Sequence, residues 1–331
     1  MRPTSSAVLL SWAGTPAFLV TNLTNILYLT GAALSAGAVL VTRKGLFLFV
    51  DSRYREASAR TVQGCTLRDI LDLPATLRRY ALCGCEGETV TVAQRDFWKK
   101  KYRGTKFLSC TGVVMHFRRS KNADELRHFR RAQKITQGIL RRVPGWLCPG
   151  LTERELAWKI NIAAHDAGAD ELAFDSIVAF GAHTSRPHHH PTARALKRGD
   201  IVQIDMGVRM EGYCADQSRV FFTRKKSPEQ ERALMAVTKA KEAAEKLVRA
   251  GVSTHQLDCV ARSVLREYGM EDAFAHALGH GVGLEIHEGV TLSCKRPAEK
   301  LLKNEIITIE PGVYFPGKFG IRLEDEIIVQ E

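Results

Sequence analysis

The sequence predicts a two-domain α/β (α+β) protein, in which a small α/β domain precedes a larger domain made of two similar halves. The chain has 331 residues, which is long for a single hydrophobic core. Short apolar runs occupy the first third, whereas helical periodicity starts at Asn122. A weak duplication spans the rest of the chain. We therefore expect domains at residues 1–120 and 121–331.

The amino-terminal part has the pattern of strands in a small domain. Apolar runs at Ala17–Val20, Ala38–Thr42 and Leu46–Val50 are separated by polar residues and glycines. No residue from Thr4 to Thr42 is charged, which would also suit a signal or membrane segment. Glycine, proline and asparagine interrupt this stretch too often for a membrane span. We expect a buried sheet region instead, and a cytoplasmic protein with no membrane partner.

The larger domain contains a repeated pattern. Gly150–Leu156 and Gly251–Leu257 align at one constant offset, and each contains a capping box, the reciprocal bonding that marks a helix start. Helices predicted at Asn122–Val143 and Pro228–Ala250 precede the two copies, and hairpin-like strands follow them. We therefore expect two helix-helix-strand halves that face one another. The two boxes pair Thr152 with Glu155 and Ser253 with Gln256.

Charge and cysteine content narrow the class of protein. The net charge of +12 would suit nucleic acid, and part of it clusters between Arg118 and Arg142. No nucleic-acid recognition motif or aromatic platform accompanies the cluster, so we interpret it as a solvated helix face. The eight cysteines form no CxxC pair, which predicts free thiols in a reducing compartment.

Acidic residues recur at matching places in the two halves. Strands predicted at Ile201–Val208 and Tyr213–Thr223 place Asp205 directly opposite Asp216 if the hairpin turns about Met210 and Glu211. Opposed like charges destabilise a sheet unless water or a cation separates them. Asp205 lies in an apolar run, which favours the cation over a surface hairpin.

The second half presents its own acidic pair, Glu310 and Glu324, roughly opposite across a turn. Three histidines lie within twelve residues nearby, and a further run sits between two prolines, where it could be an exposed tract or bind metal. Oxygen ligands with a single imidazole suit Mn, Co, Fe or Zn. The three histidines are His276, His280 and His287, and the further run is His188, His189 and His190.

These motifs, in this order, resemble the aminopeptidase P, prolidase and methionine aminopeptidase family, the pita-bread metallopeptidases. The resemblance includes Asn25–Gly31 and Asp51–Tyr54, which are similar to the creatinase-type amino-terminal domain of aminopeptidase P and prolidase. It implies a pita-bread domain with pseudo-twofold halves behind that smaller domain. The segments that carry it in the larger domain are Ile204–Gly207, Gly212–Arg219, Gly279–Leu284, Thr308–Tyr314 and Gly320–Asp325.

The resemblance implies two divalent metal ions, with Mn the first expectation and Co, Zn or Fe as alternatives. Asp216 and Glu324 would bridge both ions, Asp205 would complete one, and His280 and Glu310 would complete the other. A water or hydroxide between the ions would be the nucleophile. The substrates would be proline-containing peptides, cleaved before proline, and the protein would be a homodimer.

The resemblance also implies roles for residues around the ions. Glu310 would accept the proton, and His287 would hold the scissile carbonyl or the tetrahedral intermediate. His188 matches a substrate-binding histidine, and we count it with His287 and Glu310 as catalytic. His276 and Arg322 fit supporting, substrate-contacting places, Arg322 through neighbouring carboxylates.

Some positions depart from the family pattern and affect the substrate pocket. Phe180 and His183 stand where the family usually has Ser and Asn before the substrate-binding histidine. Val290 stands where a Pro often follows the His-Glu pair, and Gln217 replaces the common hydrophobic or Met neighbour of the bridging Asp. Two other functions remain open, a catalytically silent pita-bread binding module and metal-free, creatinase-like hydrolysis. All five ligand positions are filled, which favours the peptidase. Dipeptidase and aminopeptidase activity are not distinguished.

Overall fold

The computed structural model describes residues 6–62 and 64–331, and the chain divides into two compact units at Arg118 and Arg119. The first residues of the uncharged stretch, 4–5, lie outside this description. Helices of the first unit are α1 (Ser6–Ala13), α2 (Leu23–Thr30), α3 (Ser52–Thr61), α4 (Leu73–Leu77), α5 (Val92–Lys101) and α6 (Val113–Arg119). Its strands are β1 (Ala17–Val20), β2 (Ala38–Thr42), β3 (Gly45–Val50), β4 (Cys65–Asp69), β5 (Leu82–Glu86) and β6 (Lys106–Cys110).

The first unit is a six-stranded mixed sheet in the order β4-β3-β2-β1-β5-β6, which confirms the three predicted strands. The uncharged stretch is not sheet alone, because α1 and α2 lie within it. Asn22 caps α2 by accepting a hydrogen bond from the Asn25 amide, and Gly31 ends the helix at φ +77°. Asn22 and Gly31, which the sequence suggested as interruptions of a sheet region, are therefore the caps of α2. None of the described helices is long and apolar enough to cross a membrane.

The second unit contains the duplicated part. Its helices are α7 (Ala123–Arg142), α8 (Glu153–Asp166), α9 (Pro228–Glu245) and α10 (Thr254–Glu267). The strands of its first half are β7 (Glu171–Leu172), β8 (Ile177–Phe180), β9 (Ile201–Met206), β10 (Val208–Met210), β11 (Tyr213–Cys214) and β12 (Gln217–Phe222). Those of its second half are β13 (Gly279–His280), β14 (Thr291–Leu292), β15 (Ile306–Ile309), β16 (Gly312–Phe315), β17 (Phe319–Arg322) and β18 (Asp325–Ile328).

The two predicted halves are confirmed. Thr152 and Ser253 both form the expected capping boxes, at the starts of α8 and α10. The helix predicted to reach Ala250 is wrong at its end, because α9 stops at Glu245. Beyond it the chain tightens into turns, and the Ala250 amide bonds the Gln330 carbonyl instead of continuing the helix.

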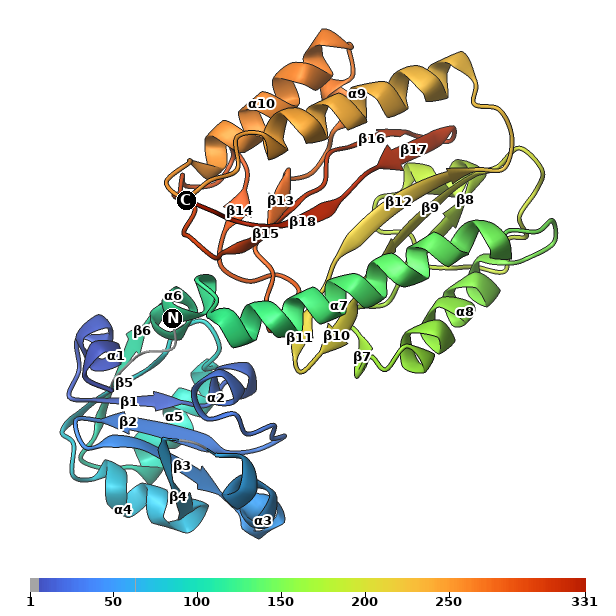
Figure 1. The fold of residues 1–331 in the computed structure, drawn as a ribbon. Coiled ribbons are helices and arrows are strands. Elements are labelled where there is room, and N and C mark those ends of the chain that lie inside the picture. Colours follow the sequence, from blue (N-terminus) through green and yellow to red (C-terminus); the bar gives the residue numbers. More distant parts are fainter. Residues whose placement is uncertain (1–5, 63) are drawn as a thin grey trace. The chain divides into compact units, whose positions relative to one another are not determined.

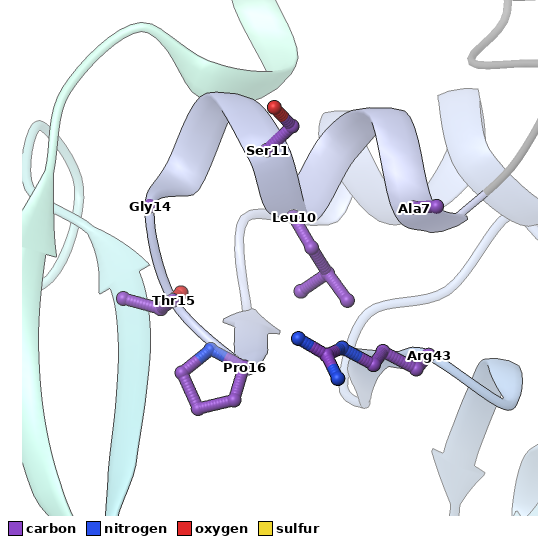
Figure 2. Close-up of a pocket in the computed structure, with 7 residues that line it drawn as sticks. All are labelled: Ala7, Leu10, Ser11, Gly14, Thr15, Pro16 and Arg43. Carbon is purple, nitrogen blue, oxygen red and sulfur yellow. The ribbon is translucent and has the colours of Figure 1, made fainter.

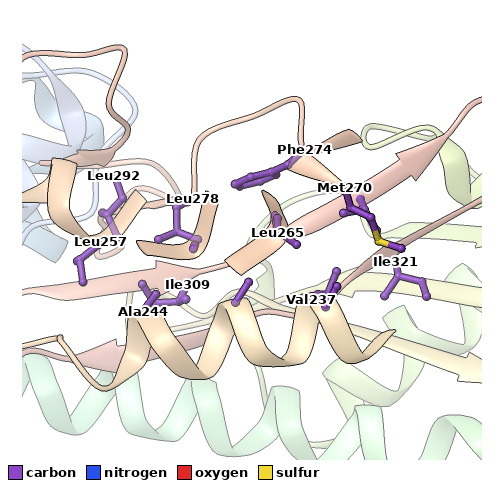
Figure 3. Packing of buried hydrophobic residues seen from close by; sticks show 14 of the residues in the cluster. Val237, Ala244, Leu257, Leu265, Met270, Phe274, Leu278, Leu292, Ile309 and Ile321 are labelled. Atoms are coloured by element: carbon purple, nitrogen blue, oxygen red, sulfur yellow. The ribbon is translucent and has the colours of Figure 1, made fainter. Parts of the chain in front are cut away.

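Each half of the second unit has its own hydrophobic core. In the first half, α7 and α8 pack on β8, β9 and β10 through residues such as Ile139, Ile160 and Ile204. In the second half, α9 and α10 pack on the later strands through Val237 and Ile309, among others (Figure 3). Figure 1 shows α7 and α8 on one side of the strands and α9 and α10 on the other. Strands from both halves therefore lie between two helical layers.

The acidic hairpin of the first half has a different register from the one predicted. Asp205 pairs with Ser218, not with Asp216. The tight turn is formed by Glu211 and Gly212, both with positive φ, as a two-residue hairpin turn requires. The predicted turn lay one residue too early, which displaces the pairing by two positions. A displacement of two keeps every side chain on its face, so Asp205 and Asp216 still share one face, as diagonal neighbours.

Both strands of this hairpin are interrupted beside Asp216. Gly207 separates β9 from β10, and a Cβ at this position would lie 1.6 Å from the Ala215 carbonyl oxygen. The Ala215 amide in turn bonds the Val208 carbonyl at 2.9 Å. Close backbone approach at Gly207 therefore creates the kink that aims Asp216 toward the centre described below.

We expect Gly207→Ala to unfold the second unit or lower its free energy of unfolding by several kcal/mol, since backbone would have to move. Gly138→Ala is the matched control, because Gly138 lies within α7 with no atom closer than 4.0 Å to an added Cβ. It should be neutral or stabilising by about 0.5–1 kcal/mol. Urea unfolding of both variants measures the difference, and equal stabilities would contradict this account of the kink.

Candidate metal centre

The structure brings the predicted ligands together at the ends of broken strands. Asp205 lies in β9, Asp216 between β11 and β12, and His280 in β13. Glu310 directly follows β15, and Glu324 directly precedes β18. The ladders on either side pair Ile309 with Asp325 and Gly312 with Arg322, which places Glu310 opposite Glu324 as predicted.

Distances define one compact cluster. The Nε2 atom of His280 lies 3.5 Å from Oδ2 of Asp216 and 3.5 Å from Oε1 of Glu310. Ligand atoms of Asp216, His280 and Glu324 all lie within 4.8 Å of one another. One imidazole and three carboxylates from both halves therefore surround a common point.

Unpaired buried oxygens show that the cluster suits cations. Asp205 Oδ1, Asp216 Oδ1 and Glu324 Oε2 are buried, and they have no hydrogen-bond partner among the residues described. A buried carboxylate oxygen without a partner is costly, and a divalent cation is the partner that several such oxygens can share. The residues present thus fit metal ions, with Asp205, Asp216, Glu310 and Glu324 supplying oxygens and His280 the nitrogen.

Burial and mutual repulsion dominate the electrostatics of these acids. Burial raises the pKa of Asp216 well above its ordinary value, and the charge of Asp205 adds to the rise. The pKa of Glu324 is raised in the same way by burial and then by Asp216. Burial raises the pKa of Glu310 to about 7, although His280 and Arg322 oppose the rise. Without a cation, these groups resist losing their protons.

The raised pKa values of these acids predict how metal and pH affect the stability of the fold. Acids whose pKa is raised by folding stabilise the fold below their unfolded pKa and lose that contribution as pH rises, for Glu310 through about 7. The metal-free protein should therefore unfold at a lower temperature at about pH 8 than at about pH 5.5. Mn²⁺ should raise the unfolding temperature far more at the higher pH. Calorimetry with and without chelator measures this, and equal shifts at both pH values would contradict it.

Arg322 connects one ligand to the surroundings of the centre. Its Nη2 donates to Asp205 Oδ2 at 2.6 Å, its Nε to Ser218 Oγ at 2.9 Å, and its Nη1 to the Tyr314 hydroxyl at 2.8 Å. Burial opposes its charge, but Tyr314, Asp205 and nearby glutamates outweigh that effect and raise the pKa of Arg322. Arg322 therefore contacts Asp205, one of the carboxylates through which we expect it to act.

Histidines border the cluster on another side. His276 accepts from or donates to the Tyr314 hydroxyl through Nε2 at 2.9 Å, and its Nδ1 lies 3.9 Å from Glu310 Oε2. The ring of His287 lies 4.2 Å from that of His280. Burial lowers the pKa of both His276 and His287 to about 4, so both imidazoles are neutral near pH 7. They can donate or accept a hydrogen bond without carrying charge.

Tyr314 is a residue of the site to which sequence reasoning assigned no role. Its hydroxyl joins His276 to Arg322, and burial raises its pKa to about 12. It lies in the Thr308–Tyr314 motif, so the motif was the available signal. Only the tertiary structure shows that its hydroxyl reaches the centre.

A second missed residue, Glu326, holds the backbone of Asp216. Its Oε1 accepts from the Asp216 amide at 2.6 Å, and its Oε2 accepts from Gln217 Nε2 at 2.7 Å. On the opposite side, Thr308 Oγ1 accepts from the His280 amide at 3.1 Å. Hydrogen bonds to their backbone amides thus orient Asp216 and His280, two of the predicted ligands.

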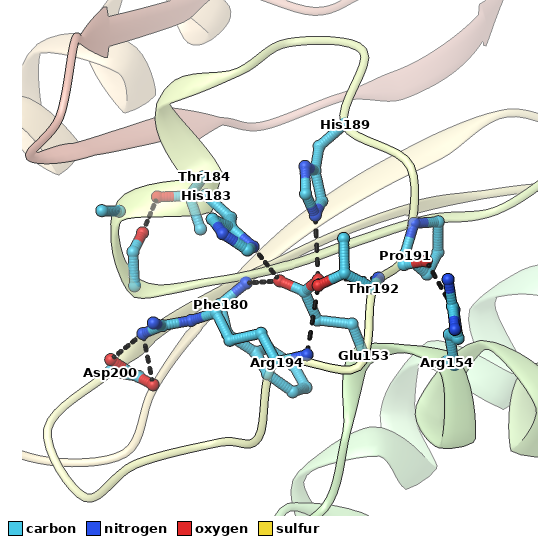
Figure 4. Close-up of polar contacts among 12 residues, drawn as sticks. Glu153, Arg154, Phe180, His183, Thr184, His189, Pro191, Thr192, Arg194 and Asp200 are labelled. Atoms are coloured by element: carbon cyan, nitrogen blue, oxygen red, sulfur yellow. Dashed lines mark hydrogen bonds and ion pairs between the residues drawn. The ribbon is translucent and has the colours of Figure 1, made fainter.

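The histidine run is not an exposed tract throughout, because His189 is buried. His189 is 5% exposed, and its Nε2 lies 2.9 Å from Oε2 of the buried Glu153 (Figure 4). His188 and His190 are exposed, as the sequence suggested. His183, a departure from the family pattern, contacts the same carboxylate through Nδ1 at 2.8 Å. Glu153 had no signal in the sequence beyond its place at a helix start.

The first unit has a pocket of its own, lined by α1, by the turn of residues 14–16 that follows it and by Arg43 (Figure 2). It contains none of the predicted site residues, all of which belong to the second unit. The eight cysteines are free thiols, as predicted.

The two duplicated halves bring together four acidic residues and one imidazole, and several of the carboxylate oxygens have no hydrogen-bond partner among the described residues. This arrangement is that of a protein that binds divalent metal ions. The chain belongs to metallopeptidase family M24, whose model matches residues 127–331. Residues 7–120 match the Creatinase/Prolidase N-terminal domain. The family and the two-part architecture predicted from the sequence are thereby confirmed.

Individual relatives agree along nearly the whole chain. A Xaa-Pro dipeptidase of Pyrococcus furiosus is 30% identical over 314 residues, which cover 93% of this chain and 88% of the relative. The crystal structure of an X-Pro aminopeptidase from Thermotoga maritima has a TM-score of 0.89 at 32% identity and covers 96% of this chain and 94% of that chain. A Xaa-Pro dipeptidase from Bacillus anthracis has a TM-score of 0.93 at 27% identity, covering 98% and 94%.

Proposed function

We propose that this metallopeptidase hydrolyses peptide bonds that precede proline. The observation that carries the proposal is the buried cluster of Asp216, His280 and Glu324 with unpaired oxygens, in a chain of family M24. The specificity for proline rests on the relatives, which are named Xaa-Pro dipeptidase and X-Pro aminopeptidase.

We assign the ligands as the resemblance implies. Asp216 and Glu324 would bridge two ions, Asp205 would complete one site, and His280 and Glu310 the other. When bound, the ions would lower the pKa of a shared water and polarise the scissile carbonyl. Glu310, whose Oε1 lies 3.5 Å from His280 Nε2, would accept the proton of the attacking water.

The neutral histidines hold the substrate. His287 donates a hydrogen bond to the oxygen of the scissile carbonyl, where charge develops as the tetrahedral intermediate forms. His188 contacts the substrate from the loop after β8, and His276 lies beside Glu310. Arg322 donates hydrogen bonds to Asp205 and to the Tyr314 hydroxyl and so holds both side chains in place. The residue roles explain why both halves must meet to form one site.

We further propose Mn²⁺ as the metal, because oxygen-rich ligand sets with one imidazole suit it. A homodimer, the functional domains at 1–120 and 121–331, and a cytoplasmic location remain our predictions. Metal analysis of the purified protein tests the choice of Mn²⁺, and sedimentation of the full chain tests the homodimer.

The decisive experiment compares a Gly-Pro dipeptide with an Xaa-Pro-Xaa tripeptide, after chelation and again with Mn²⁺ restored. Cleavage of the dipeptide alone would identify a dipeptidase, and cleavage of the tripeptide an aminopeptidase. Gly-Ala is the matched control and should stay intact. If neither proline peptide is cleaved with metal present, the proposal fails in favour of a catalytically silent binding module.

A further inference from the structure

A single buried carboxylate gathers the loop that follows β8. Glu153, the first residue of α8, is 0% exposed. Its Oε1 accepts from the Phe180 amide at 2.9 Å and contacts His183 Nδ1 at 2.8 Å. Its Oε2 accepts from the Thr192 amide at 2.9 Å and hydroxyl at 2.6 Å, and contacts His189 Nε2 at 2.9 Å. Both ends and the middle of the loop 180–192 therefore meet at one side chain (Figure 4).

The protonation states follow from the contacts. Burial opposes the charge of Glu153, but the hydrogen bonds from His189, Thr192 and Phe180 outweigh it and lower its pKa. An ionised carboxylate only accepts hydrogen bonds, so His183 and His189 carry a proton on the nitrogens that face it. Five donors offset the cost of burying this charge.

The helix start itself does not need this glutamate. In the second half, Thr254 takes the corresponding first position of α10. Its hydroxyl accepts from the Glu299 amide at 3.1 Å and collects no loop of histidines. The buried charge of Glu153 therefore serves the loop rather than the repeat.

The same loop carries His188 to the metal centre. Next to the buried His189, the side chain of His188 is exposed, and it is one of the groups near enough to His276 and His287 to contribute to lowering the pKa of both. The preceding Pro187 carbonyl accepts from Arg322 Nη1 at 3.3 Å. The short segment is thus held by Glu153 on one side and by Arg322 on the other.

We propose that Glu153 is a positioning residue for His188: together with His183 and His189 it fixes the loop 180–192 so that His188 faces the bound peptide. The contact of His188 with peptide rests on the proposed function, whereas the anchoring of the loop does not. The hydrogen bonds account for both carboxylate oxygens without a third metal ion, although the three side chains also have ligand spacing.

The test uses a double-mutant cycle in the Mn²⁺-loaded full chain. Glu153→Gln replaces an acceptor with an NH₂ group facing donors, and should lower kcat/KM for the Xaa-Pro substrate by about 10²-fold, as a slight misplacement does. In the His188→Ala background the same change should cost less than about twofold, because the two residues act as a unit. Equal losses in both backgrounds would overturn the proposal, since Glu153 would then act elsewhere.

Matched variants separate positioning from general stability. His189→Gln keeps a nitrogen donor in the place of Nε2 and should retain activity, whereas His189→Leu should behave like Glu153→Gln. Glu155→Gln, at an exposed position two residues further along α8, should change neither activity nor loop order. Loss of activity in His189→Gln and His189→Leu alike would contradict a role for the hydrogen bond.

Two measurements do not depend on turnover. Hydrogen exchange of residues 180–192 should accelerate in Glu153→Gln while α10 stays protected. Metal analysis should give the same metal content in wild type and variant. Unchanged exchange, or loss of one ion from the variant, would overturn the proposal. If the wild type cleaves no proline peptide, the proposed function fails, while the exchange result still decides whether Glu153 anchors the loop.

Discussion

Replacing Glu310 with Gln is expected to lower kcat for an Xaa-Pro substrate by about 10²–10⁴-fold, the usual contribution of a general base. The Glu310 carboxyl lies within the cluster, 3.5 Å from His280 Nε2, where it can accept a proton from a water held there. The amide keeps one oxygen for a ligand but cannot take a proton. Steady-state kinetics at saturating Mn²⁺, with the metal content measured in parallel, checks the prediction.

Glu271→Gln is the matched control for this substitution, because Glu271 forms an exposed ion pair with Arg266 away from the cluster. Its kcat should equal that of the wild type. If Glu310→Gln retains full metal content and full kcat, the assignment of Glu310 as the base is wrong. Loss of metal together with loss of activity would show that Glu310 is a metal ligand. The pH profile of the residual activity would then decide whether it is also the base.

Asp216→Asn is expected to change stability and activity in opposite directions. In the metal-free protein at about pH 8 it removes a buried acid whose ionisation is disfavoured by burial and by Asp205, so the unfolding temperature should rise. A gain of about 1 kcal/mol would appear as roughly 2–4 °C. Stabilisation by Mn²⁺ and hydrolysis should both be lost, because the variant lacks the carboxylate that we propose as a bridging ligand.

Asp272→Asn, at an exposed position, provides the comparison for Asp216→Asn and should leave stability and metal response unchanged. Differential scanning fluorimetry with chelator and with Mn²⁺ measures all three effects. A lower unfolding temperature for metal-free Asp216→Asn would show that Asp216 stabilises the fold by itself and would contradict the account of strained carboxylates.

Local features of the second unit could be predicted because their causes are local. Asn122 begins α7 by accepting from the amides of Asp124 and Glu125, and Ser227 begins α9 in the same way. Such caps depend on residues three positions apart, which a sequence displays directly. The end of α9 at Glu245 could not be found in this way, since the bond from Ala250 to Gln330 joins distant segments.

The residues that complete the centre depend on contacts across the fold. Asp205 and Asp216 were expected opposite each other, but the turn at Glu211 and Gly212 sets another register. His189 looked like an exposed histidine until the fold placed Glu153 beneath it. Burial, hydrogen-bond partners and register are properties of neighbouring segments, so periodicity within one segment does not determine them.

The sequence by itself determined the family, the duplicated architecture and the five acidic and imidazole side chains that suit metal, because residue type and order are enough to specify a ligand set and a cap. Only the tertiary structure decided which oxygens are left without partners, which histidines stay neutral and which carboxylate anchors the loop of His188. The physical reason is that desolvation and hydrogen bonding depend on what lies within a few ångströms in space, and those neighbours come from segments far apart along the chain.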